Sequence, residues 1–269
     1  MSDITIHPFD QALQLLGGPN RFYGHPSPAY ANTRGPFGGI TAAMLLSVLL
    51  EHPDRLGDPV SQTVNYVAPI ADEAFEIDVQ LLRTNRSTQH WFVTLMQEGG
   101  VAASSTAVFA KRRETWGDTE LSLPTIPPVE ACQRVDTAFL PTWAKNYAMW
   151  FEDSVPFFGS GARQSSETVQ WLREKPPRAL NFASLASMCD LFFPRIFIRS
   201  AQFAPVGTVS LTTYFHTQAT QLAAHGEQLL IGRARANRFN DSYYDQSAEI
   251  WSSSGELFAT SNQIVYFKL

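Results

Sequence analysis

The sequence FGGITAAMLLSVLL, at residues 37–50, is almost entirely apolar after its two glycines. Its length and its content of Ala and Leu favour an α-helix over a strand, and Pro53 marks the end of that helix. A helix that is apolar on nearly every side needs cover on nearly every side, so we expect it to be deeply buried. The apolar run is too short to span a bilayer.

Strand-like runs follow this helix, and the same plan returns in the second half of the chain. The first half has runs at residues 60–69, 74–84, 90–98 and 101–112, with a hairpin signal at Glu98-Gly99-Gly100. The second half has strand-like stretches at 147–155 and 167–173, a helix at 180–193 stopped by Pro194, and runs at 208–217, 227–237, 242–252 and 256–268. The two halves are therefore predicted to be copies of one unit.

Direct alignment of the two halves supports this repeat. Residues 99–105 align with residues 255–261 at an offset of 156. Tyr66 aligns with Tyr214 at an offset of 148, and loops of different length account for the difference between the two offsets.

The predicted fold class is α+β. In each domain an antiparallel sheet wraps around one long central helix, because only a strongly curled sheet can cover a helix that is apolar all round. This is the hotdog arrangement, and two tandem copies make a double hotdog whose sheets can pair edge to edge. We predict domains at residues 1–112 and 142–269, joined by a Pro-containing linker at 113–141.

Composition and charge limit the classes of function. The 269-residue chain has a net charge of −5 and no basic stripe, which argues against a nucleic-acid partner. Cys132 and Cys189 form no CxxC pair, so we expect neither a disulfide framework nor a metal site. The N-terminus lacks the features of a signal peptide, and we expect a cytoplasmic protein without a membrane partner.

The residues around the start of the first helix resemble a known family. Pro36-Phe37-Gly38-Gly39 is similar to the Phe-Gly-Gly helix entry of the acyl-CoA thioesterase II family. Pro69, which closes the strand containing Tyr66, also fits the family pattern, and the resemblance covers nearly the whole chain. It implies hydrolysis of an acyl-CoA to a free fatty acid and CoA, with no cofactor beyond the CoA of the substrate. It also allows a homo-oligomer, either a dimer or a tetramer.

Each of the family's three catalytic residues has a counterpart of the same type in this chain. Asp190 falls on the second predicted helix, Thr208 at the start of the next strand and Gln263 on the last strand. The resemblance implies that Asp190 is the general base that activates a water molecule, while Thr208 and Gln263 hold this water. Apolar neighbours of Asp190 are expected to raise its pKa. Ser210-Leu211 and Ile40 depart from the residues usual in the family and leave the acyl chain length open.

Gly38 and Gly39 are the candidates for an oxyanion site. A helix N-terminus offers free backbone N–H groups and a favourable dipole, and glycine allows a substrate carbonyl to approach closely. This role requires that the first helix faces Asp190 across the two domains.

The repeat predicts a single site per chain. At the offsets above, Gln263 corresponds to Ala107 and Thr208 to Val60, and the first helix carries no acidic residue. The first domain is therefore expected to act as a scaffold and as the wall of the acyl site.

Two other functions stay open at this point. A hotdog enoyl-CoA hydratase or dehydratase would need an acid/base pair such as Asp with His, and no His lies between Asn181 and Ser200. A non-catalytic double hotdog that binds acyl-CoA or lipid would keep the apolar tunnel and would not need Asp190. Retention of all three polar groups favours the enzyme.

Overall fold

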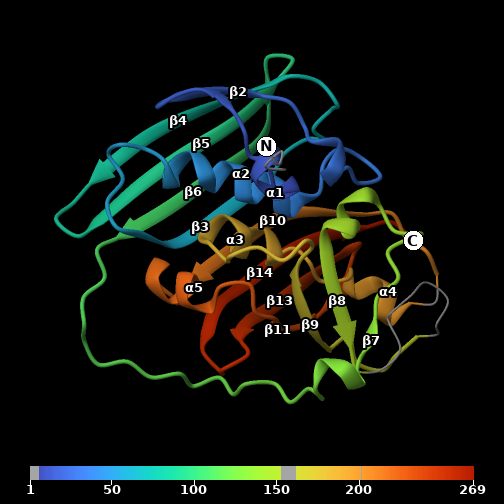
Figure 1. Ribbon diagram of the computed structural model, residues 1–269. Coiled ribbons are helices and arrows are strands. Elements are labelled where there is room, and N and C mark those ends of the chain that lie inside the picture. Colours follow the sequence, from blue (N-terminus) through green and yellow to red (C-terminus); the bar gives the residue numbers. More distant parts are fainter. Residues whose placement is uncertain (1–5, 153–161, 201) are drawn as a thin grey trace, which may run out of the picture.

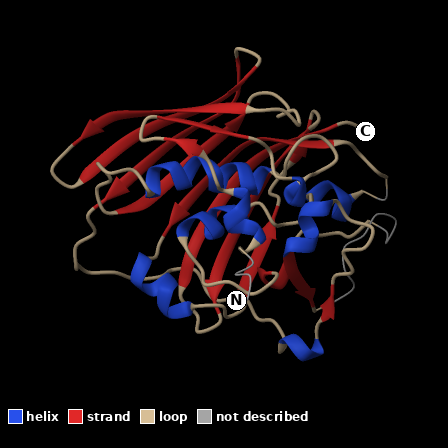
Figure 2. Ribbon diagram, turned by 45° about the horizontal axis from the view of Figure 1, so that its top comes forward, coloured by secondary structure: helices blue, strands red, loops and turns tan. Residues whose placement is uncertain are grey.

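The computed structural model describes residues 6–152, 162–200 and 202–269, and their strands form one continuous antiparallel sheet (Figure 1). The order across the sheet is β1-β2-β4-β5-β6-β3-β10-β14-β13-β11-β9-β8-β7, with β12 paired to β13. Figure 2 shows that the helices gather on one side of this sheet. The predicted α+β fold, with two tandem hotdog units, is confirmed.

The first half of the chain wraps its strands around the predicted helix. This helix, α2 (Gly38–Leu50), is buried from Gly39 to Leu49, as its apolar sequence requires. The strands beside it are β2 (Arg21–Gly24), β4 (Phe75–Thr84), β5 (Thr88–Gln97), β6 (Gly100–Ala110) and β3 (Asp58–Tyr66). Three short elements precede it, α1 (Pro8–Ala12), β1 (Leu16–Gly17) and η1 (Pro28–Tyr30).

The second half repeats this arrangement around a shorter helix, α3 (Phe182–Met188). Its main strands are β8 (Tyr147–Phe151), β9 (Thr168–Glu174), β10 (Val206–Phe215), β11 (Leu230–Arg235), β13 (Tyr243–Ser252) and β14 (Leu257–Phe267). Smaller elements are η2 (Val129–Ala131), β7 (Gln133–Arg134), η3 (Thr142–Asn146), α4 (Arg195–Arg199), α5 (Ala219–His225) and β12 (Phe239–Asn240).

The prediction of a helix over 180–193 is wrong in its length, because α3 ends at Met188. The N–H of Asp190 bonds the carbonyl oxygen of Ser187 at 3.2 Å, and this i→i+3 bond tightens the last turn and ends the helix. Pro194 then precedes the separate helix α4, since proline cannot continue a helix but is tolerated where one starts. Asp190 therefore lies in a turn beyond the helix instead of on it.

β3 and β10 join the two halves into one sheet. Gln62 pairs with Thr213, and Asn65 pairs with Ser210, in antiparallel register. At an offset of 148 residues, Gln62 corresponds to Ser210 and Asn65 corresponds to Thr213. Exchanging the two halves therefore turns each of these pairs into the other, as a twofold axis between the halves would do. The edge-to-edge pairing predicted from the sequence is present, and α2 packs against α3 beside this joint.

The structure differs from two predictions in the second half, one for a strand and one for the linker. The strand predicted at 147–155 ends at Phe151, and residues 153–161 lie outside the described residues. The stretch predicted as a linker contains β7, which pairs with β8 at the edge of the sheet. The domain boundaries at 112 and 141 stay predictions.

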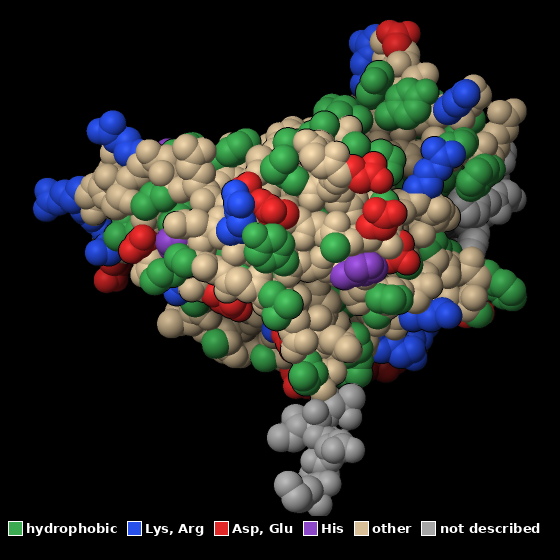
Figure 3. Space-filling view, turned by 90° about the horizontal axis from the view of Figure 1, so that it is seen from above, with side chains coloured by type: hydrophobic (Ala, Val, Ile, Leu, Met, Phe, Trp, Pro, Cys, Tyr) green, Lys and Arg blue, Asp and Glu red, His purple; other side chains and the backbone are tan. Residues whose placement is uncertain are grey.

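The outer surface mixes apolar and charged side chains. Seen from above, hydrophobic side chains lie between charged side chains of both signs (Figure 3). No helix in the described parts of the chain is long and apolar enough to cross a membrane.

Candidate active site

Asp190 lies where the two halves meet, between the end of α3 and the start of α2. Its Oδ1 accepts a hydrogen bond of 2.7 Å from Nε2 of Gln263, which reaches it from β14. The backbone N–H of Gly39, in the first turn of α2, also stabilises the charged form of this carboxylate. Gly38 adjoins the other carboxylate oxygen, since a Cβ built on Gly38 would lie 2.7 Å from Oδ2. The structure thus brings Asp190 together with Gln263, Gly38 and Gly39.

Close packing of the two helices requires the glycine at position 39. A Cβ there would lie 2.4 Å from the carbonyl oxygen of Ser187 and 2.4 Å from the ring of Phe37. Both distances are far shorter than van der Waals contact, so α2 and α3 can approach this closely only where no side chain intervenes. The close approach brings the positive N-terminal end of α2 to the carboxylate of Asp190.

Thr208 faces the same side of the sheet as Gln263 because of a β-bulge. Thr208 pairs with Val265 and Leu211 pairs with Gln263, and the ladder shifts register between them at Val209. Paired residues point to the same face, and Val265 and Gln263 are two residues apart, so Thr208 shares their face. Without the extra residue it would point the opposite way. In the described residues, Thr208 makes no side-chain hydrogen bond to Asp190 or Gln263.

Burial sets the ionisation of Asp190. Loss of hydration raises the pKa of Asp190 to about 7, while the hydrogen bonds from Gln263 and Gly39 stabilise the charged form and oppose this rise. Part of the residue stays accessible to solvent. A carboxylate that is half ionised near pH 7 and within reach of water suits a general base.

Side chains of β14 hold the turn that carries Asp190. Ser261 Oγ at 3.5 Å and Gln263 Nε2 at 3.4 Å both approach the carbonyl oxygen of Cys189. Cys189 itself is buried, and burial raises the pKa of its thiol to about 12, so it stays neutral and a poor nucleophile. Ser261 is a residue that sequence reasoning missed, because its inward direction follows from strand register.

Tyr66 completes the site from the first half of the chain. Its hydroxyl donates a hydrogen bond of 2.8 Å to the carbonyl oxygen of Gly38. Burial, and then the nearby charge of Asp190, raise the pKa of Tyr66 well above its usual value, so it stays a neutral donor. Sequence reasoning used Tyr66 only to align the repeat. A shielded tyrosine hydroxyl needs a hydrogen-bond partner, but the sequence does not tell which one.

A small apolar cavity lies beside α2 on the side of the first half. Its volume is about 10 Å³, which is room for about one water molecule. The lining includes Ile40, Thr41, Met44, Ile70, Phe75 and Leu95. Because Ile40 directly follows Gly39, the cavity begins next to the groups that hold Asp190.

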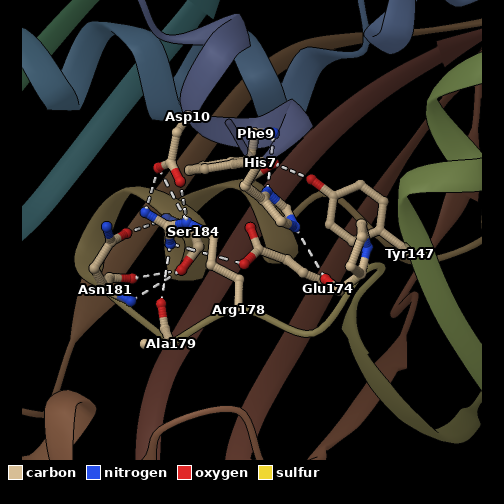
Figure 4. Close-up of polar contacts among 11 residues, drawn as sticks. His7, Phe9, Asp10, Tyr147, Glu174, Arg178, Ala179, Asn181 and Ser184 are labelled. Carbon is tan, nitrogen blue, oxygen red and sulfur yellow. Dashed lines mark hydrogen bonds and ion pairs between the residues drawn. The ribbon is translucent and has the colours of Figure 1, made fainter. Parts of the chain in front are cut away.

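A second polar cluster lies at the N-terminal end of α3 (Figure 4). Arg178 bonds both carboxylate oxygens of Asp10 at 2.6 to 3.0 Å and thereby ties α1 to the second half. Glu174 is 2% exposed, its oxygens accept no hydrogen bond, and Arg178 Nη1 lies 3.8 Å from Oε2. Burial raises the pKa of Glu174 to about 8. This cluster joins the halves and does not contact Asp190 in the described residues.

Metal ligands do not gather around Asp190. Across the described residues, no group of three or more His, Cys, Asp or Glu side chains is placed to hold a metal ion.

Comparison with known proteins adds independent findings. The family described as acyl-CoA thioesterase C-terminal domain matches residues 122–267, and the acyl-CoA thioesterase N-terminal domain matches residues 26–110. None of the curated proteins matches the chain.

Solved structures give the same fold over nearly the whole chain. A conserved hot dog protein of unknown function from Alicyclobacillus acidocaldarius is 40% identical, with a TM-score of 0.94 over 98% of this chain and 99% of that one. A candidate thioesterase II from Thermobifida fusca is 20% identical, with a TM-score of 0.82 over 99% of both chains. The acyl-CoA thioesterase II TesB2 from Mycobacterium marinum is 16% identical, with a TM-score of 0.74 over 97% of this chain and 98% of that one. At these identities the last two show the fold alone.

Proposed function

The chain belongs to the acyl-CoA thioesterase family, and we propose that it hydrolyses acyl-CoA with Asp190 as the general base. Membership of this family makes the chain a thioester hydrolase. The observation that carries the mechanism is the 2.7 Å hydrogen bond between Gln263 Nε2 and Asp190 Oδ1 beside the N-terminus of α2.

In the proposed mechanism a water molecule binds between Asp190, Gln263 and Thr208. Gln263 uses its Nε2 to bond Asp190, and no donor within the described residues contacts its Oε1, which can accept a hydrogen bond from the water. Thr208 supplies a hydroxyl from the same face of the sheet. Asp190 removes a proton as the water oxygen attacks the thioester carbonyl carbon.

Attack converts the carbonyl oxygen into an oxyanion, and Gly38 and Gly39 are the proposed site for it. The N–H of Gly38 lies in the first turn of α2, where the helix offers it no acceptor, and it is the proposed donor to the developing oxyanion. The C–S bond then breaks, the CoA sulfur receives the proton from Asp190, and the free acid is released. One water is consumed, and one acid and one thiol are formed.

Thiol release from acyl-CoAs of increasing chain length tests this proposal, with the wild type beside Asp190→Asn. Release by the wild type that is lost in the variant supports Asp190 as the base. Equal release by both proteins would contradict the mechanism. If neither protein releases thiol while calorimetry detects bound acyl-CoA, the chain is a binding module instead.

A hydratase finds no support in the contacts of Asp190. Such chemistry would pair the carboxylate with an imidazole, whereas the side chain that bonds Asp190 here is the amide of Gln263. The absence of a cofactor requirement stays a prediction, and activity that survives dialysis against a chelator would support it. The oligomeric state also stays a prediction.

A further inference from the structure

Tyr66, in β3 of the first half, approaches Asp190 without bonding it. The Cβ position of Gly38 lies 3.3 Å from the Tyr66 hydroxyl and 2.7 Å from Asp190 Oδ2, so Gly38 separates the two side chains. The Tyr66 hydroxyl donates a hydrogen bond of 2.8 Å to the carbonyl oxygen of Gly38. That proton is therefore engaged and does not point at the carboxylate.

The Gly38 carbonyl and the Gly39 N–H belong to one planar peptide group. Fixing the direction of the carbonyl therefore fixes the direction of the N–H at the opposite side of the group. This N–H is the one that stabilises the charged carboxylate of Asp190, and the Cβ position of the adjoining Gly38 lies 2.7 Å from Oδ2 of that carboxylate. Hydrogen bonds in series also polarise one another, so a bond accepted by the carbonyl strengthens the bond donated by the N–H.

From this geometry we propose that Tyr66 is a positioning residue for Asp190, acting through the Gly38–Gly39 peptide. The inference rests on the proposed role of Asp190 as the base. Helix α2 sets the general orientation of this peptide, and because glycine has little intrinsic backbone preference, the contact with Tyr66 holds the first turn more firmly in place. The backbone just after Tyr66 is itself fixed, because the N–H groups of Val67 and Ala68 both bond the carbonyl oxygen of Ala102.

Tyr66→Phe removes the hydroxyl and keeps the ring. The Gly39 N–H then holds the charged form of Asp190 less well, so the pKa of Asp190 rises. The acidic limb of the kcat/KM profile is expected to move to higher pH by about half a unit to one unit. The rate at high pH, where Asp190 is ionised in both proteins, is expected to stay within about twofold of the wild type, with KM little changed.

Tyr214→Phe is the matched control. Tyr214 is the counterpart of Tyr66 in the repeat, and it is 45% exposed on β10. The acidic limb of this variant is expected to coincide with that of the wild type. A purely structural effect of losing a tyrosine hydroxyl would lower the rate at every pH and would leave the midpoint of the limb in place.

A measurement that does not need activity completes the test. In protein labelled with ¹⁵N-glycine, the Gly39 amide signal follows the ionisation of Asp190 and is assigned by the loss of its titration in Asp190→Asn. The midpoint is expected at higher pH in Tyr66→Phe than in the wild type. Equal midpoints in folded Tyr66→Phe and wild type would overturn the role of Tyr66. Activity that persists in Asp190→Asn would instead overturn the proposed base, and the amide titration would still decide whether Tyr66 controls the carboxylate.

Discussion

Gln263 Nε2 lies 2.7 Å from Asp190 Oδ1, although 73 residues separate them in the chain. The bond joins β14, the last strand in the chain, to the turn that follows α3. Gly39 approaches the same carboxylate from the other half of the chain. The candidate site therefore depends on both halves, while the residues of its proposed reaction belong mainly to the second.

Replacement of Asp190 by Asn is expected to lower kcat by at least about 100-fold, because the amide cannot accept a proton from water. In the wild type, activity is expected to rise with pH through the pKa of about 7, since only the ionised carboxylate can act as a base. A pH profile of thiol release with both proteins checks this. A wild-type rate that falls as pH rises from 6 to 8 would contradict the assignment.

Gln263→Ala removes a donor to the carboxylate and is expected to raise the pKa of Asp190. The acidic limb should move to higher pH by about one to two units, because a hydrogen bond to a charged group contributes about 1.5 to 3 kcal/mol. The maximal rate should also fall, since the water loses its proposed acceptor. Asn262→Ala is the control, because this neighbour on β14 is exposed on the opposite face. If the acidic limb has the same midpoint in Gln263→Ala as in the control, Gln263 does not stabilise the ionised form of Asp190.

Gly39→Ala is expected to destabilise the protein. Alanine at a helical position is ordinarily more favourable than glycine by about 0.5 to 1 kcal/mol. Here its Cβ would meet the Ser187 carbonyl at 2.4 Å, and overpacking of this kind costs about 1 to 3 kcal/mol. Denaturant unfolding gives the change in free energy. Gly117→Ala, where no atom lies within 4 Å of the added Cβ, should show no comparable loss.

Glu174→Gln tests the buried cluster at the start of α3. The folded protein holds the Glu174 proton with a pKa of about 8, against 4.5 for the free side chain. The stability that this group contributes is complete below about pH 4.5 and is lost as pH rises toward 8. The melting temperature of Glu174→Gln minus that of the wild type is therefore expected to increase as pH rises from about 4.5 to 8. Above pH 8 this difference is expected to stay constant. Glu114 is exposed, and the melting temperature of the control Glu114→Gln should change with pH as that of the wild type does. The same pH dependence in Glu174→Gln as in the wild type would contradict the raised pKa of Glu174.

Met44→Ala should enlarge the apolar cavity beside α2. Met44 is 4% exposed and lines the cavity together with Ile40 and Leu95. If the acyl chain enters there, the chain length with the highest kcat/KM should increase, at a stability cost of about 2 to 5 kcal/mol. The acyl-CoA panel measures this shift at a temperature where the variant stays folded. An unchanged preference would place the acyl chain elsewhere.

Much of the fold could be predicted because it depends on local patterns. The apolar run at residues 37–50 has the composition of a buried helix, and α2 matches it closely. Turn glycines marked the hairpins, and Gly99 and Gly255 both adopt positive φ. The repeat then implied the pairing of the two sheets, because two copies of one curled unit leave edges that can cover each other.

The sequence also named Asp190 and Gln263, through resemblance to the family, and it showed that the first half lacks their counterparts. Tertiary structure decided the rest. The end of α3 depends on i→i+3 hydrogen bonds that the periodicity of the sequence does not reveal. Asp190 therefore lies in a turn, although the sequence predicted it on a helix. The bulge at Val209 decided the face of Thr208, because one extra residue reverses the alternation of a strand. The contact of Tyr66 with the Gly38–Gly39 peptide depends on where β3 lies against α2, and such contacts between distant segments form only when the whole sheet closes around its helices.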